Sequence, residues 1–225
     1  MKKVLPLIIA LLFVLGGCNP SNNDSATGQT DAVSAATEAR YREGEVREYK
    51  GARLDPAVGP RDNSISGIQT VDIEDYQLEV TGLVKKPLQL QYNEVRALTP
   101  YERKITLHCV EGWEATILWE GVRIMEIIGM AEPNPEAVTV IFHAVDGYTT
   151  SLPLQTVMDR DLILAYDANG LELPPEMGYP FIVVAEDKLG YKWARWVNGI
   201  ELSDDPDYKG YWEQRGYSNE ANLES

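Results

Sequence analysis

The cysteines constrain this chain most, because there are only two of them, Cys18 and Cys109, in 225 residues. Cys18 ends the apolar N-terminal segment, so the body that follows has one thiol and no partner for an internal disulfide. With only His108 and His143 in addition, a zinc site built from several Cys and His ligands is excluded. A hydrophobic core must therefore stabilise the body, and 44% hydrophobic residues are typical of a globular domain.

The charge balance excludes another class of protein. The chain carries 20 Lys and Arg against 35 Asp and Glu, a formal net charge of -15. Binding to nucleic-acid phosphates needs a basic face, so nucleic acid is not expected as a partner. The same balance argues against attachment to an anionic membrane surface through a basic patch.

The N-terminus is typical of an exported lipoprotein. Lys2 and Lys3 precede an apolar run over residues 4–15, which is too short for a membrane-spanning helix and suits a signal-peptide core. The Leu-Gly-Gly-Cys that ends at Cys18 resembles the bacterial lipobox, and this resemblance implies that Cys18 is diacylated. We therefore expect a lipoprotein signal peptide at 1–17 and an extracytoplasmic, membrane-anchored protein, on the cell surface or in the periplasm depending on the host. A buried amphipathic helix or a plain membrane anchor is the alternative.

Residues 18–48 are predicted to be the lipidated cysteine and a disordered tether. The segment is rich in Ser, Asn, Thr, Ala and Gly at first and in charged residues later, with almost no large apolar side chains. Such a composition buries too little surface to offset the entropy lost on ordering. The folded domain is then expected over residues 49–225.

The rest of the sequence predicts an α+β domain that is mostly β. Alternating or continuous apolar stretches indicate strands over 76–84, 104–110, 138–142, 148–152, 162–166, 181–185 and 193–202. Helical spacing indicates short helices over 91–98 and 122–130. The sequence has neither regular βα alternation nor an internal repeat, which argues against a doubly wound sheet and a solenoid.

One segment resembles a known family. It reads Thr106-Leu107-His108-Cys109-Val110-Glu111-Gly112-Trp113 and is similar to the molybdopterin-binding domain of the sulfite oxidase family, in particular its methionine sulfoxide reductase branch. Further segments match in family order across about residues 60–205, namely 76–84, 119–122, 146–154, 178–181, 190–193 and 200–202. The resemblance implies a sulfite oxidase-type domain with a pocket for the molybdenum–molybdopterin cofactor.

For Cys109 the resemblance implies that the thiolate binds molybdenum and is the catalytic cysteine. A soft thiolate suits a metal that also carries sulfur ligands from the pterin. The residues alone leave two other roles open for Cys109. It is a small apolar residue buried in a strand, or a redox-active thiol without a metal.

The resemblance also implies contacts to the rest of the cofactor, whose phosphate needs cations and backbone amides. Lys188, Lys192 and Arg195 surround Gly190, where the family holds this phosphate, and all four are candidate cofactor-binding residues. The alternative for the three cations is a solvated basic edge. Asn63 stands in a loop where the family has an asparagine that contacts the cofactor.

The two histidines are weaker candidates. His108 is next to Cys109 and would hydrogen-bond to the pterin, or it faces away, because neighbours along a strand alternate between faces. His143 is more in keeping with a hydrogen-bonded core or edge histidine than with a cofactor contact. A group of aromatic residues is expected to pack the C-terminal segment onto the sheet, with a place at the rim of the pocket as the alternative: Trp193, Trp196, Tyr211, Trp212 and Tyr217.

Two features depart from the family pattern. Ile182 stands where the methionine sulfoxide reductase branch has an arginine. The leader carries Lys2 and Lys3 where cofactor-loaded molybdenum proteins carry paired arginines for export in the folded state. Both features favour an alternative in which the domain works without the cofactor.

The sequence thus predicts a lipid-anchored, molybdopterin-dependent oxidoreductase that transfers an oxygen atom to or from a small-molecule substrate. The sequence contains no Cys-x-x-Cys-His motif for haem attachment, so a separate electron-transfer partner is expected. The alternative is a cofactor-free surface binding lipoprotein that retains the fold.

Overall fold

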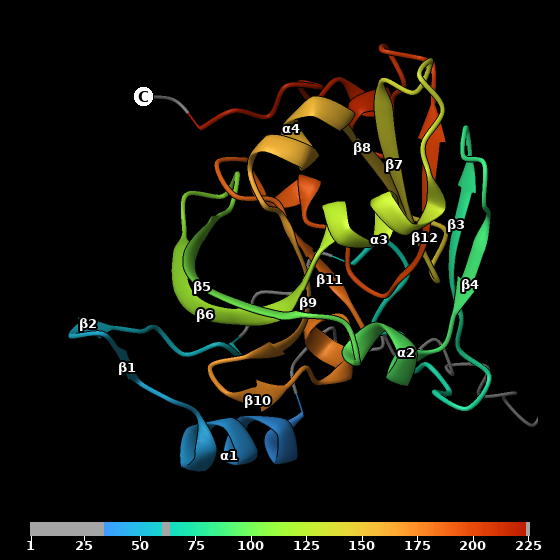
Figure 1. Ribbon diagram of the computed structural model, residues 1–225. Coiled ribbons are helices and arrows are strands. Elements are labelled where there is room, and N and C mark those ends of the chain that lie inside the picture. Colours follow the sequence, from blue (N-terminus) through green and yellow to red (C-terminus); the bar gives the residue numbers. More distant parts are fainter. Residues whose placement is uncertain (1–33, 60–63, 224–225) are drawn as a thin grey trace, which may run out of the picture.

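The computed structural model describes residues 34–59 and 64–223. The signal peptide, Cys18 and Asn63 lie outside the described residues. Two five-stranded sheets form the body, and short helices pack against them (Figure 1). The helices are α1 (Ala35–Gly44), α2 (Tyr92–Arg96), α3 (Ile124–Ala131) and α4 (Leu154–Asp159). The predicted fold class, mixed α and β with mostly strands, is confirmed.

The first sheet has the strand order β10-β9-β6-β5, and β11 also pairs with β9. Its strands are β5 (Pro100–His108), β6 (Glu114–Arg123), β9 (Ile163–Ala168), β10 (Leu171–Glu172) and β11 (Ile182–Val184), all antiparallel to their neighbours. The long hairpin of β5 and β6 places its turn, residues 109–113, at one end of the sheet. This turn carries the cysteine singled out in the sequence.

The second sheet has the order β4-β3-β12-β7-β8. Its strands are β3 (Leu78–Gly82), β4 (Leu88–Leu90), β7 (Thr139–Ala144), β8 (Thr149–Pro153) and β12 (Val197–Ser203). Strand β12 runs parallel to β3 and antiparallel to β7, so the last strand in the chain lies in the middle of the sheet. A separate two-stranded ribbon consists of β1 (Glu48–Tyr49) and β2 (Ala52–Arg53).

The apolar strand residues form one core cluster that includes side chains of both large sheets. Trp119 of β6, Phe142 of β7, Leu164 of β9 and Ile200 of β12 are all buried in it. Burial of such side chains is the main favourable term in folding. The core fixes the two sheets relative to the loops that connect them, and these loops form the site described below.

Two sequence predictions need correction. The first is strand β6, which was not predicted, because its residues 117–119 and 122 are apolar without a period of two, and residues 122–130 were taken as a helix. The helix, α3, begins at Ile124. Glu114, Thr116 and Glu120 of β6 alternate with apolar neighbours, but the buried Leu118 stands where a further polar residue would complete the period.

The second correction concerns the predicted tether, which is helical over α1. Ser34 caps the helix by accepting a hydrogen bond from the backbone N–H of Thr37 at 3.1 Å. Tyr41 is buried, and its hydroxyl donates to the carbonyl of Glu172 at 2.8 Å. One buried tyrosine and a cap therefore order a segment whose average composition is typical of disorder.

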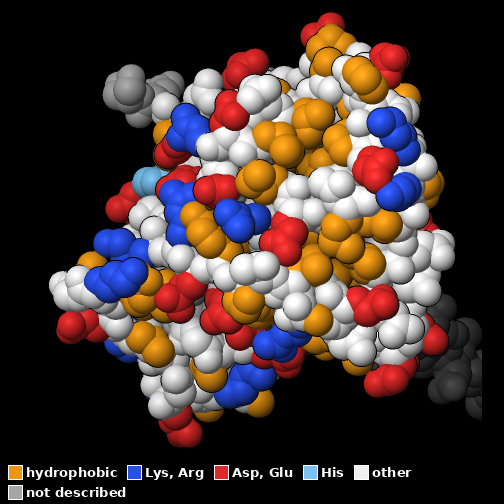
Figure 2. Space-filling view, in the orientation of Figure 1, with side chains coloured by type: hydrophobic (Ala, Val, Ile, Leu, Met, Phe, Trp, Pro, Cys, Tyr) orange, Lys and Arg blue, Asp and Glu red, His pale blue; other side chains and the backbone are white. Residues whose placement is uncertain are grey.

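The surface shows how the charge is distributed. Acidic and basic side chains are intermingled on the face shown in Figure 2. Over residues 34–59 and 64–223, no helix is both long enough and apolar enough to cross a bilayer.

Candidate functional site

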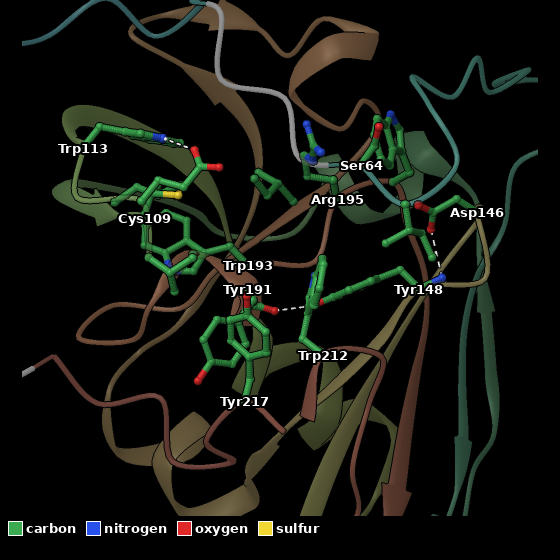
Figure 3. A pocket seen from close by; sticks show the side chains of 17 residues that line it. Ser64, Cys109, Trp113, Asp146, Tyr148, Tyr191, Trp193, Arg195, Trp212 and Tyr217 are labelled. Atoms are coloured by element: carbon green, nitrogen blue, oxygen red, sulfur yellow. Dashed lines mark hydrogen bonds between the residues drawn. The ribbon is translucent and has the colours of Figure 1, made fainter. Parts of the chain in front are cut away.

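A cavity of about 500 Å³ lies beside the turn between β5 and β6 (Figure 3). Its described lining comes from five places in the sequence: residues 64–65, the segment 107–113, the turn 146–148, the segment 182–196 and the C-terminal segment 212–217. These are far apart in the chain, so the cavity exists only in the folded domain. A concave pocket with a few polar groups is the usual form of a small-molecule or cofactor site.

Cys109 lies in the wall of this cavity, just after β5 ends. Its backbone N–H donates to the carbonyl of Trp113 at 2.9 Å, and Gly112 donates back to the carbonyl of Cys109 at 3.0 Å. Gly112 has φ +85°, a left-handed conformation that favours glycine and lets the turn close. Cys109 as a whole residue is 9% exposed and lines the cavity, so it faces the cavity rather than bulk solvent.

Gly190 is the second predicted residue in the wall, at the start of the 3-10 turn η2 (Gly190–Lys192). The preceding residue, Leu189, forms a parallel bridge with His108, which brings this turn against the cysteine turn. Trp193 closes η2 by donating its backbone N–H to the carbonyl of Gly190 at 3.0 Å. Two turns that are remote in sequence are thus held together on one side of the cavity.

Arg195 is the third predicted residue in the wall, and it is the only basic side chain among the described lining residues. Its Nη1 donates to the carbonyl of Glu176 at 3.1 Å, and its guanidinium carbon lies 4.5 Å from the ring centre of Trp196. These contacts hold a delocalised cation at the cavity, which is the kind of group that binds phosphate oxygens. Glu111 and Asp146 are the acidic residues of the described wall.

The predicted phosphate contacts of Lys192 and Lys188 are corrected by the structure. The ammonium of Lys192 is fully buried and donates to three oxygens: Glu213 Oε1 at 2.5 Å, Ser151 O at 2.9 Å and Asn219 Oδ1 at 3.0 Å. Three donors are all that an ammonium has. Burial lowers the pKa of Lys192, and the Glu213 carboxylate opposes this shift.

Lys188 is used in a similar way. Its Nζ donates to the carbonyl of Glu220 at 2.9 Å and to Oδ1 of Asn222 at 2.5 Å. Neither lysine contributes to the described wall of the cavity. Both hold the C-terminal segment, so Arg195 alone of the three predicted cations is placed to meet a cofactor.

The prediction for His108 is likewise corrected. Leu107 and Cys109 face the cavity, and His108 between them points to the other side of the strand, where its Nδ1 lies 3.1 Å from Oε2 of Glu114. His143, on the interior strand β7, is a hydrogen-bonded histidine as the sequence favoured, with Nε2 at 2.8 Å from Oε2 of Glu201 on the neighbouring strand β12. Ser64, next to the predicted Asn63, lines the cavity.

Aromatic rings form much of the wall, more than the sequence predicted. Four of the five aromatic residues expected to pack the C-terminal segment also line the cavity: Trp193, Trp196, Trp212 and Tyr217. The fifth, Tyr211, packs between Tyr148 and Trp212. Trp113, Tyr148 and Tyr191 were not predicted, although each stands at the edge of a glycine turn that the sequence does show.

The residues present fit a molybdenum–molybdopterin group. The described residues contain no cluster of three or more His, Cys, Asp or Glu side chains that would hold a metal ion by themselves. A metal at Cys109 would therefore take most of its ligands from an organic group, which is how a dithiolene cofactor presents molybdenum. The cavity supplies the remaining requirements: one thiol, one guanidinium and room for a flat organic molecule.

Comparison with known proteins supports this assignment. The family model described as the oxidoreductase molybdopterin binding domain matches residues 65–212. The uncharacterized oxidoreductase YuiH of Bacillus subtilis is 39% identical over 147 residues, which cover 65% of this chain and 74% of that protein. The protein-methionine-sulfoxide reductase catalytic subunit MsrP of Gluconobacter oxydans is 30% identical over 154 residues, covering 60% of this chain and 49% of that protein.

Among solved structures, the sulfane dehydrogenase SoxCD from Paracoccus pantotrophus matches with a TM-score of 0.60 and 25% identity. The match covers 62% of this chain and 41% of that one. The chain therefore spans about three quarters of YuiH but only about half or less of the other two proteins.

Proposed function

The chain belongs to the family of molybdopterin-binding oxidoreductases, and on that basis we propose that it transfers an oxygen atom to or from a small substrate at a molybdenum bound by Cys109. The carrying observation is the position of Cys109, in the wall of the cavity of about 500 Å³ and beside the η2 turn. The cofactor supplies the redox chemistry when bound. The chain supplies a thiol, a cation and a shaped cavity.

The cysteine turn has a fixed backbone. The backbone bonds between Cys109, Gly112 and Trp113 fix the turn, so only rotation of the Cys109 side chain is left to place the sulfur for a metal. A metal also favours the thiolate form, because ligation removes the proton. Arg195 is then the cation for the phosphate of the cofactor, in place of the two lysines that the sequence suggested.

We propose a neutral oxidised substrate, such as an S-oxide or N-oxide, rather than a small anion such as sulfite. The described wall carries the carboxylates of Glu111 and Asp146 against the single guanidinium of Arg195. The chain as a whole has a net charge of -15, which repels anions at low ionic strength. Relatives named as methionine sulfoxide reductase subunits agree with a neutral S-oxide.

We further propose that the protein is anchored outside the cytoplasm by lipid on Cys18, and that a separate redox protein exchanges electrons with it. The support is the sequence of the leader and the scarcity of cysteines. Mass spectrometry of the N-terminal peptide from the native host tests the anchor. A Cys18→Ser chain should leave the membrane fraction, and an unlipidated wild-type chain would contradict the proposal.

Ile182 favours a second candidate, a binding protein that retains the fold without the cofactor. This side chain is buried and lines the cavity where the related branch has an arginine. Molybdenum analysis of protein purified from its native host separates the two candidates. Near-stoichiometric molybdenum that is lost in a Cys109→Ser chain that still folds supports the enzyme. A metal-free wild-type chain of normal stability would support the binding protein instead.

A further inference from the structure

The C-terminal strap, residues 204–223, lies across strand β8 and forms part of the cavity wall. Tyr211 donates its backbone N–H to the carbonyl of Thr149 at 2.9 Å. At Gly210 the two backbones are so close that an added methyl group would stand 2.1 Å from the oxygen of Thr149. The strap is therefore docked closely on the sheet, and its side chains have fixed positions.

One buried ion pair secures the strap. Lys192 and Glu213 are wholly buried as side chains, with Nζ and Oε1 2.5 Å apart. Oε1 of Glu213 also accepts a hydrogen bond from Thr150 at 2.7 Å, and Lys192 reaches Asn219 further along the strap. The lysine thus joins strand β8 to two points of the strap, on either side of Tyr217.

The residues that flank this pair line the cavity. Tyr191 and Trp193 stand directly before and after Lys192, and Trp212 stands directly before Glu213. Tyr217 lies between the two strap residues that Lys192 holds, and its ring centre is 5.3 Å from that of Tyr191 and 5.1 Å from that of Trp212. Figure 3 shows these three rings gathered on one side of the cavity.

We propose that Lys192 is a positioning residue that, through Glu213, holds the strap in place, and that Trp212 and Tyr217 on the strap set the size of molecule that reaches Cys109. Tyr217 is 41% exposed, so it stands where the wall meets solvent. The inference rests on the proposed function only in taking Cys109 as the place where the substrate reacts. It concerns access to that cysteine and is tested without the cofactor.

The test measures alkylation of Cys109 in the full chain carrying Cys18→Ser, which leaves one thiol. Two reagents are compared: iodoacetamide is the small one and a polyethylene glycol maleimide is the large one. The readout is the rate of alkylation by the large reagent divided by the rate by the small one. Each variant's ratio is compared with that of the Cys18→Ser chain. Trp212→Ala and Tyr217→Ala should each raise this ratio about tenfold, because removing either ring widens the way to Cys109 and lowers the barrier for the large reagent by about 1.4 kcal/mol. Glu213→Gln and Lys192→Met should raise it as well.

Lys188→Met is the matched control, because this buried lysine holds only residues 220 and 222 of the strap, beyond Tyr217. Its ratio should stay at the background value. Unchanged ratios in Trp212→Ala and Tyr217→Ala would overturn the proposal, whatever the lysine variants do. If Lys192→Met and Glu213→Gln only lower the melting temperature and leave the ratio unchanged, Lys192 has no positioning role. Alkylation is measured on the metal-free chain, because a metal bound to Cys109 would block the thiol. Failure of the proposed function would be seen separately, in the molybdenum analysis of protein from the native host.

Discussion

Gly190 stands against Cys109 in the cavity wall: a methyl group added at Gly190 would lie 3.8 Å from the Cα of Cys109 and 3.4 Å from the carbonyl oxygen of His108. These are ordinary contact distances, so the backbone there tolerates one extra carbon. A side chain larger than alanine at position 190 would extend into the cavity, because Gly190 and Cys109 both line it. The glycine therefore keeps space open beside the thiol.

A size series at Gly190 tests this relationship. We expect Gly190→Ala to keep normal molybdenum content and Gly190→Leu to lower the fraction of loaded protein about tenfold, since overpacking costs 1–3 kcal/mol and each 1.4 kcal/mol is a factor of ten. Metal analysis after purification from the native host gives the result. Full loading of the leucine variant would show that the cofactor does not use this side of the cavity.

The cation in the wall gives a second prediction. Arg195→Met keeps an aliphatic stem over Trp196 but removes the charge, so cofactor retention should fall severalfold while Arg195→Lys retains part of it. Loss of the bond to the Glu176 carbonyl should cost about 1 kcal/mol of stability. Released pterin is measured by its fluorescence after oxidation.

Arg160→Met is the control for this prediction, because Arg160 is half exposed and pairs with Asp187. Exposed ion pairs contribute roughly 0–1 kcal/mol, so this variant should keep both stability and cofactor. Equal cofactor content in Arg195→Met and Arg160→Met would remove Arg195 from the site.

The sequence predicted the fold class and most strands because their apolar runs are short and separated by turn residues. It did not predict β6, where the apolar residues 117–119 interrupt the polar alternation, or α1, which depends on the burial of Tyr41. The order of strands in the sheets could not be predicted from the sequence either. The parallel pair of β3 and β12 places Val80 opposite Ile200, two residues that are far apart in the sequence. No local sequence pattern predicts such a pairing.

At the site, the sequence identified residues of the right chemistry but not whether their side chains point into the cavity or into the core. Lys192 and Arg195 are three residues apart, and both looked like phosphate ligands. In the structure the ammonium of Lys192 is buried and pairs with Glu213, whereas the guanidinium of Arg195 lies in the cavity wall. The partner that decides this is 21 residues further along the chain and is recognisable only after folding.

The close contact between strap and sheet gives a third prediction, on stability. Gly210→Ala should lower the free energy of unfolding by about 1–3 kcal/mol, because the added methyl group collides with the Thr149 oxygen. Gly129→Ala is the matched control: it lies in helix α3 with nothing within 4 Å of an added carbon, and should raise stability by about 0.5–1 kcal/mol. Urea unfolding monitored by circular dichroism measures both. A neutral Gly210→Ala would mean that the strap is not closely docked.

A fourth prediction concerns alkaline pH. Burial, and the nearby Glu213 carboxylate, raise the pKa of Tyr191 to about 12 in the folded chain, whereas an exposed tyrosine titrates near ~10. Above pH ~10 the unfolded chain therefore releases more protons than the folded one, and the free energy of unfolding falls as the pH rises toward the folded value. The protonated hydroxyl matters directly, because it donates to the carbonyl of Ser218 on the strap at 2.7 Å.

Tyr191→Phe isolates the contribution of the Tyr191 hydroxyl to stability. The phenyl ring keeps the packing, but it neither titrates nor donates a hydrogen bond. At neutral pH the variant should be less stable by about 1 kcal/mol, the contribution of one hydrogen bond. Its stability should then fall less steeply above pH ~10 than that of the unmutated chain, so the two curves converge, while the other buried tyrosines, such as Tyr166, titrate in both proteins. Thermal unfolding at intervals from neutral to strongly alkaline pH gives the comparison. Stability curves of the two proteins that stay parallel throughout would contradict the prediction. They would mean that Tyr191 has the same pKa in the folded and unfolded chains.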